Sequence, residues 1–215
     1  MRSKFDEQLN LLNEEMIQMG TMIEENIQNA IEALVKSDVK AAKEIMERDA
    51  LVDKKQRDIE SLCFNLLIQQ QPVAKDLRAI TAAMKMVTDM ERIGDHAADI
   101  SEMTIMLSES GKIGGYDTIV KMAAEASVML IRSIDAFAEK DAEKAGEVIA
   151  HDDIVDALFD EVKAELIELI KTDVERGEQE IDMLMIAKYL ERIGDHATNI
   201  AEWVIYSLKN KGTVD

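Results

Sequence analysis

Acidic side chains recur at four-residue intervals along one predicted helix of this 215-residue chain. Glu91 and Asp95 share a helix face with small and apolar residues, and Asp99 continues the row by one more turn. Those small and apolar neighbours are Met84, Val87 and Ala98. Carboxylates therefore interrupt a face that would otherwise pack into a core. Hard oxygen ligands in such a place are suited to binding a multivalent cation.

The same pattern recurs in the second half of the chain. Glu191 and Asp195 occupy the equivalent positions of a second predicted helix, and Asn199 stands in place of the third carboxylate. The helix that precedes each row carries a further acidic pair at four-residue spacing. These pairs are Asp49 with Asp53 and Asp152 with Asp156.

Each acidic pair places two like charges one helical turn apart, which is unfavourable by about 0.2–0.5 kcal/mol on a solvated helix. In a partly buried bundle, unpaired carboxylates cost more free energy or take up protons. Because the arrangement occurs on two helices in each half, we predict that a multivalent cation compensates it. The alternative is ordinary surface charge, which Arg92 and Arg192 would partly neutralise.

The histidines and glycines of the repeated segment have other predicted roles. His96 and His196 directly follow the aspartates and point about 100° away from the carboxylate row. We therefore predict that they pack or form hydrogen bonds and do not bind the cation. Gly94 and Gly194 each destabilise a helix by about 1 kcal/mol relative to alanine. Their repetition predicts a close approach of two helices at this point.

These residues belong to an internal repeat. Residues 91–97 recur without change as residues 191–197, and residues 31–53 align with residues 134–156. The boundaries of the predicted helices follow from three residues: Asp38 as an N-cap, Pro72 at a helix start and Gly177 at a helix end.

Each half is thus predicted to contain three helices. They span residues 4–36, 38–70 and 73–109 in the first half, and residues 117–139, 141–175 and 178–209 in the second. Residues 1–110 form the first three-helix repeat, the Gly-rich residues 111–116 form a linker, and residues 117–215 form the second repeat. The predicted fold class is all-α, with two tandem, pseudo-symmetric three-helix bundles.

Composition narrows the classes of function. Aromatic residues make up 4% of the chain, and abundant helix formers favour an all-helical fold. The net charge of −19 argues against nucleic-acid binding and favours cationic partners. We find no signal peptide and no apolar run of the roughly 18–20 residues that a membrane span needs. The sequence therefore predicts a cytoplasmic protein without direct membrane insertion. Cys63, the single cysteine, is predicted to be a buried, inert thiol.

The repeated Glu-Arg-Ile-Gly-Asp-His-Ala segment, the Asp-x-x-x-Asp pairs and the duplicated unit resemble the PhoU family over essentially the whole chain. The resemblance implies an accessory negative regulator of high-affinity phosphate uptake and of the phosphate-starvation response, acting when phosphate is plentiful. It also implies homodimers, and an adaptor role between the cytoplasmic components of the phosphate ABC transporter and a sensor histidine kinase.

The same resemblance implies multinuclear sites for iron or zinc in the acidic motifs. The implied ligands are Asp49, Asp53, Glu91, Asp95 and Asp99 in the first repeat, and Asp152, Asp156, Glu191, Asp195 and Asn199 in the second. Because Asn199 supplies a neutral oxygen, the second site is expected to carry less negative charge.

Three other functions compete with a regulatory role. A ferritin-like di-iron enzyme needs Glu-x-x-His pairs, which this sequence lacks, and no nucleophile–base pair or phosphate-binding loop is present. We therefore predict that the protein is not an enzyme. A metal store would share the carboxylates without needing a signalling partner. A purely structural helical protein would not explain why the carboxylates are repeated.

Overall fold

The computed structural model describes residues 2–69, 72–110 and 117–209, and these ranges contain six α-helices, one short 3-10 helix and no β-strand. The elements are α1 (Arg2–Lys36), α2 (Val39–Gln69), α3 (Ala74–Ser110), α4 (Asp117–Glu139), α5 (Ala142–Thr172), η1 (Val174–Arg176) and α6 (Gly177–Leu208). The all-α prediction is confirmed, and each predicted helix matches an observed one to within a few residues. None of the described helices is both long and apolar enough to cross a membrane.

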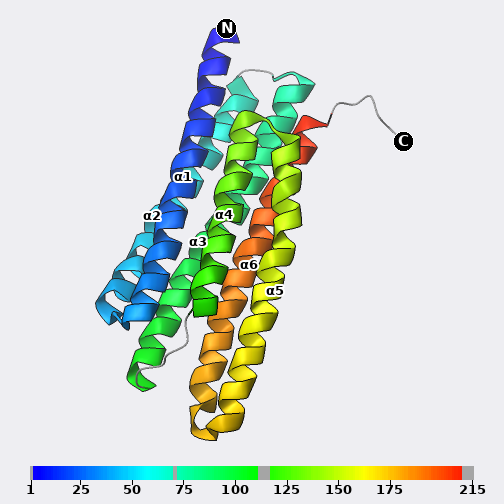
Figure 1. Ribbon diagram of the computed structural model, residues 1–215. Helices are drawn as coiled ribbons and strands as arrows, with labels where there is room; N and C mark the ends of the chain where they lie inside the picture. Colours follow the sequence, from blue (N-terminus) through cyan, green and yellow to red (C-terminus); the bar gives the residue numbers. More distant parts are fainter. Residues whose placement is uncertain (1, 70–71, 111–116, 210–215) are drawn as a thin grey trace.

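The helices form two units that pack side by side, α1–α3 and α4–α6 (Figure 1). The most extensive contact between two helices joins α3 to α6, and α1 also packs against α4. Buried apolar residues of both units belong to one hydrophobic core. The predicted tandem bundles are therefore present, and equivalent helices join them. The predicted linker, residues 111–116, lies outside the described residues.

Methionine and branched aliphatic side chains fill the shared core. Met16, Met19, Met86 and Met90 are fully buried. Their flexible thioether side chains adapt to gaps between helices in a core with few aromatic rings. Cys63 is also fully buried, and burial raises the pKa of its thiol to about 12. The predicted inert thiol is confirmed, because the thiolate is the reactive form.

The first connection of each unit has the same geometry. Ser37 after α1 and Lys140 after α4 adopt left-handed backbone conformations, with φ of 52° and 59°. The backbone amides of Asp38 and Asp141 each donate to a carbonyl five residues earlier, at 2.8 Å and 2.9 Å respectively. These hydrogen bonds close the C-terminal ends of α1 and α4. The same aspartate side chain accepts two amides of the following helix. The prediction that Asp38 is an N-cap is therefore confirmed, and Asp141 is the equivalent N-cap in the second unit.

Removing either of these caps is expected to destabilise the fold measurably. Asp38→Ala and Asp141→Ala should each lower the free energy of unfolding by about 1 kcal/mol, because two amides lose their acceptor. Urea denaturation followed by circular dichroism measures this change. Serine at the same positions keeps an acceptor and should lose less. Equal losses for alanine and serine would show that the caps are not the cause.

Gly177 does not end α5 as predicted, although it is the C-cap residue of the short helix η1. α5 already ends at Thr172, because Asp173 has an extended backbone. Its side chain accepts the amide of Glu175 and so caps the start of η1. Gly177 has φ of −55° and ψ of −38° and is the first residue of α6. The aspartate is therefore the residue that ends α5, and the glycine has an ordinary helical conformation.

Pro72 lies slightly outside the helix that it was predicted to begin. α3 starts at Ala74, and the carbonyl of Val73 accepts the amide of Leu77 at 2.9 Å. Val73 is thus the residue at the helix boundary. The difference is within the range over which helix ends are commonly assigned.

Candidate metal centre

Three of the predicted ligands converge where α2 faces α3. Asp49 and Asp53 lie on successive turns of α2, and Asp95 lies on α3. One carboxylate oxygen from each lies within 4.8 Å of the other two, and all three residues are partly buried. We call these residues the α2–α3 triad. Three hard oxygen donors at this separation fit one multivalent cation.

Gly94 allows α2 and α3 to approach closely beside the triad. A β-carbon at Gly94 would lie 2.9 Å from Cγ1 of Val52 and 3.7 Å from Oδ1 of Asp49. Val52 is fully buried, so it has little room to move. The close approach predicted from the repeated glycine is therefore confirmed here. It sets the distance between the aspartates of α2 and Asp95.

Asp49 has the least favourable electrostatic environment of the triad. Its Oδ1 atom is buried and has no hydrogen-bond partner among the described residues. Burial raises the pKa of Asp49, and the charges of Asp95, Asp53 and Asp99 raise it further, to about 6. A cation would give this oxygen a partner and would relieve the repulsion among the carboxylates.

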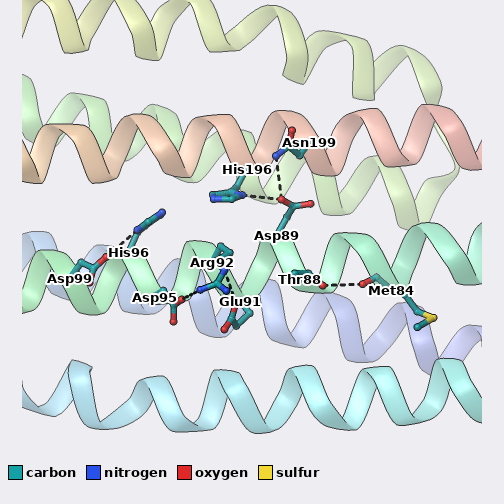
Figure 2. Close-up of polar contacts among 10 residues, drawn as sticks. All are labelled: Met84, Thr88, Asp89, Glu91, Arg92, Asp95, His96, Asp99, His196 and Asn199. Atoms are coloured by element: carbon teal, nitrogen blue, oxygen red, sulfur yellow. Dashed lines mark hydrogen bonds and ion pairs between the residues drawn. The ribbon is translucent and has the colours of Figure 1, made fainter.

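Positive side chains compensate part of the charge around the triad. Nη1 of Arg92 donates to Oδ2 of Asp95 at 2.8 Å, and Nε of Arg92 lies 3.5 Å from Oε2 of Glu91 (Figure 2). Nη1 of Arg57 lies 3.7 Å from Oδ2 of Asp53. Burial and the charge of Asp95 raise the pKa of Glu91. Arg92 therefore has the neutralising role that the sequence predicts for it.

The second unit repeats the acidic motif with a looser geometry. Asp152 is partly buried, and burial raises its pKa together with the charges of Asp156 and Asp195. Asp156 and Asp195 are themselves exposed, and Glu191 forms an ion pair with Lys188. Within the described ranges, a convergent group of three potential ligands of the His, Cys or acidic type occurs only at the α2–α3 triad.

The last residue of each predicted ligand row faces other neighbours. Oδ2 of Asp99 lies 3.1 Å from Nδ1 of His96. The side-chain amide of Asn199 donates to Oδ1 of Asp89 at 3.2 Å, and Nδ1 of His196 lies 2.9 Å from the same oxygen (Figure 2). Asp89 therefore links α3 to two side chains of α6. The structure does not bring Asp99 or Asn199 into the convergent group, and their role as ligands stays a prediction.

The histidines lie at the interface between the two units. His96 is buried, and its ring stacks on Tyr189 at 5.5 Å and lies 5.8 Å from the ring of His196. Burial lowers the pKa of His96, and its contact with Asp99 opposes that effect. The predicted packing and hydrogen-bonding role is confirmed. Asp89 was not among the residues predicted from the sequence, although it lies seven residues before His96 on the same helix face.

The raised pKa of Asp49 predicts that cation binding depends on pH. Protons compete with the cation below about pH 6, so affinity should fall up to about tenfold per pH unit there. In the metal-free protein, the pKa of Asp49 in the folded state lies above the ordinary value of 3.8 for an aspartate. The contribution of Asp49 to stability is therefore present below about pH 4 and is lost as the pH rises through 6. Calorimetric titration with Zn²⁺ between pH 5 and pH 7 measures the first effect, and equal affinities across this range would contradict it.

The comparison with protein families gives two matches to the same model. The PhoU domain model matches residues 16–104 and residues 119–204, one match in each unit. A PhoU homologue from Clostridium acetobutylicum, named as a phosphate-specific transport system accessory protein, is 38% identical over 98% of this chain and 96% of its own length. A homologue of the same description from Synechocystis is 35% identical over 98% of this chain and 93% of its own length.

Solved structures share the whole fold. The crystal structure of PhoU from Pseudomonas aeruginosa has a TM-score of 0.89 and 33% identity, over 95% of this chain and 98% of that one. The phosphate transport system regulatory protein PhoU from Streptococcus pneumoniae has a TM-score of 0.85 and 29% identity, over 94% of this chain and 96% of that one. The similarity therefore extends over both units and their relative placement.

Proposed function

The chain belongs to the PhoU family, and on this basis we propose that it is a cytoplasmic negative regulator of phosphate uptake and of phosphate-starvation signalling. It is an adaptor between the cytoplasmic components of the phosphate ABC transporter and a sensor histidine kinase, and it acts as a homodimer. The names of its relatives support a regulatory role in phosphate transport. They describe an accessory protein, which supports a function without catalysis.

A multivalent cation, iron or zinc, is the second part of this proposal. Asp49, Asp53 and Asp95 hold it, with Glu91 at the edge of the site. The observation that carries this assignment is the buried Asp49 oxygen, which lacks a hydrogen-bond partner beside two other carboxylates. The bound ion supplies positive charge there and joins α2 to α3. The looser acidic group of the second unit, around Asp152, is proposed as a weaker site.

Metal occupancy sets the rigidity of the surface that α2 and α3 present to a partner. The support for this step is that the α2–α3 triad takes its ligands from two helices, so the ion restrains one against the other. The net charge of −19 favours partners whose contact surfaces are cationic. It disfavours nucleic acids and anionic lipid surfaces.

The first experiment measures metal content. Protein purified without chelator should contain a transition metal by plasma mass spectrometry, and the Asp95→Asn/Asp195→Asn variant should lose it. Metal-free wild-type protein would contradict the second part of the proposal. A variant that loses metal but keeps both its thermal stability and its partner binding would contradict the proposed coupling of metal to the surface.

A metal-storage protein without a signalling partner is the alternative function, and the α2–α3 triad is equally compatible with it. A deletion strain separates the two. Phosphate-starvation genes expressed despite abundant phosphate would support the regulator. Normal repression with altered metal tolerance would support the store. Complementation with wild-type protein and with the Asp95→Asn/Asp195→Asn variant then shows whether metal binding is needed for repression.

A further inference from the structure

An apolar groove follows the junction of the two units on the side where α1 meets α4. The two helices pack side by side and run in opposite directions (Figure 1). The groove between them has a volume of about 780 Å³, and we call it the α1–α4 groove. Its aliphatic lining includes Ile27, Ile31 and Val35 of α1 and Val120, Val128 and Ile131 of α4. Val35, Val120 and Val128 are 45%, 41% and 39% exposed, so the described part of the chain leaves this apolar surface largely uncovered.

The apolar wall that α4 gives to the groove is not a requirement of the repeat. Three of its residues have polar equivalents on α1. Ala124, Val128 and Ile131 of α4 correspond to Thr21, Glu25 and Gln28 of α1. The two helices occupy equivalent places in their units, so packing within a unit does not explain the difference. An aliphatic surface on the outside of one helix alone is suited to contact with another molecule.

The two edges of the groove carry opposite charges. Glu24 and Glu32 lie on the α1 edge, and Arg132 lies on the α4 edge. Lys121 is exposed on the same row of α4, three turns before Arg132. Within the described ranges, neither Lys121 nor Arg132 forms an ion pair. Glu32 pairs with Lys36, but both side chains are exposed, and such a pair contributes little.

One acid interrupts the basic row on α4. Glu125 lies between Lys121 and Arg132, but its carboxylate is directed to α5. Oε2 of Glu125 lies 2.7 Å from Nε2 of His151. The α4 edge of the groove therefore keeps its positive character.

The register of α1 against α4 places the opposite charges at matching heights. Gly20 lies against Ile134, which fixes one level of the antiparallel pair. Each residue further along α1 then corresponds to one residue earlier on α4, because both helices rise by the same distance per residue. Glu24 is therefore nearly level with Arg132, and the second acid of the α1 edge is nearly level with Lys121.

We propose that two copies of this chain associate through the α1–α4 groove, about a two-fold axis parallel to the two helices. This axis lays α1 of one copy over α4 of the other at the same height. Glu24 then faces Arg132 of the second copy, and Glu32 faces Lys121 of the second copy. Each of these pairs occurs twice, and the apolar linings of the two grooves cover each other. The proposal rests on the homodimer of the proposed function and assigns a surface to it.

The charges also select this axis over the other one that the groove allows. A two-fold axis perpendicular to the helices would lay α1 over α1 and α4 over α4. It would bring the two acidic edges together and the two basic edges together. Like charges facing each other across an interface oppose association, so the parallel axis is favoured.

The first test measures the dissociation constant of the dimer by sedimentation equilibrium of the full chain. Val128→Glu introduces the residue that the first unit has at the equivalent position, and the dissociation constant should rise at least about tenfold because a charge becomes buried without a partner. Ile167→Glu is the matched control, since Ile167 is 45% exposed on α5 and does not line the groove. It should leave the dissociation constant unchanged. Thermal melts followed by circular dichroism check that both variants are folded.

The second test uses charge reversal to establish which helices face each other. Glu24→Lys and Arg132→Glu should each weaken their own homodimer, because each places like charges opposite one another twice. An equimolar mixture of the two variants should associate more tightly than either variant alone, because every such pair in the mixed dimer is attractive. A tighter homodimer of either single variant would mean that α1 faces α1, and this would overturn the proposal.

The outcomes separate this surface from the proposed function. A dimer whose dissociation constant is unchanged by Val128→Glu would overturn the surface and leave the homodimer in place. Wild-type protein that stays monomeric up to about 100 µM would overturn both, and the groove would then be open to a different protein. The regulatory role is measured independently, by phosphate-dependent repression in the deletion strain.

Discussion

Asp49→Asn is expected to stabilise the metal-free protein and, at the same time, to lower its affinity for a divalent cation by at least about 100-fold. Even the loss of a residue that only orients a metal ligand costs about 10–100-fold in affinity. The substitution removes one of three converging carboxylates and its charge. Calorimetric titration of Zn²⁺ or Mn²⁺ at pH 7 measures the change in affinity.

The gain in stability has a different cause from the loss of metal. At pH 7 the Asp49 carboxylate is ionised in both the folded and the unfolded protein. Its pKa of about 6 in the folded protein shows that folding disfavours the charged form. Allowing for solvent screening, neutral asparagine should raise the free energy of unfolding by about 1 kcal/mol. Near pH 4 the wild-type carboxyl is protonated in the folded state, so the two proteins should be nearly equal in stability.

Asp152→Asn is the matched control in the second unit. Burial also raises the pKa of Asp152, yet this residue belongs to no convergent group of three ligands in the described structure. Its substitution should leave the tightest cation site nearly unchanged. If Asp152→Asn and Asp49→Asn lowered affinity equally, the two units would contribute equally and the assignment to the α2–α3 triad would be wrong.

Gly94→Val is expected to lower the free energy of unfolding by about 2–3 kcal/mol, in the range found for overpacked cores. The new β-carbon would lie 2.9 Å from Cγ1 of Val52, which is fully buried, so α2 and α3 must move apart. That movement also separates Asp49 and Asp53 from Asp95. Cation affinity should therefore fall together with stability, as urea denaturation and metal titration of one variant can show.

Two further variants isolate the steric cause. Val52→Ala removes the methyl group that the new side chain of Gly94→Val would meet. The Gly94→Val/Val52→Ala double variant should therefore lose less stability than the sum of the losses of the two single variants. Gly146 is exposed in α5, and nothing lies within 4 Å of its added β-carbon. Gly146→Val should therefore stay within about 0.5 kcal/mol of wild type. A similar loss at Gly146 would mean that backbone preference, and not close packing, explains the effect at Gly94.

The helices and their repetition could be predicted because their signals are local. Apolar spacing determines each helix, and Asp38 caps α2 through amides two and three residues away. A segment that is repeated in the sequence predicts two similar structural units, whatever their placement relative to each other. The prediction was wrong at Gly177 because two local signals compete there, and the extended backbone at Asp173 ends α5 first.

The composition of the candidate metal centre could be predicted only in part. Helical periodicity placed Glu91, Asp95 and Asp99 in one row, but each four-residue step turns the helix by about 40°. Asp99 is therefore rotated by about 80° from Glu91, and its carboxylate contacts His96. Periodicity gives the direction of a side chain around its own helix. It does not say which neighbouring helix lies in that direction.

The amino-acid sequence by itself determined the helices, their duplication, the position of the acidic pairs along α2, α3, α5 and α6, and the glycines between them. Only the tertiary structure decided that Asp49, Asp53 and Asp95 converge while the exposed Asp156 and Asp195 do not. The physical reason is that ligand convergence depends on how far apart two helices pack and at what rotation. Side chains distant in the sequence set that spacing, as Val52 does against Gly94.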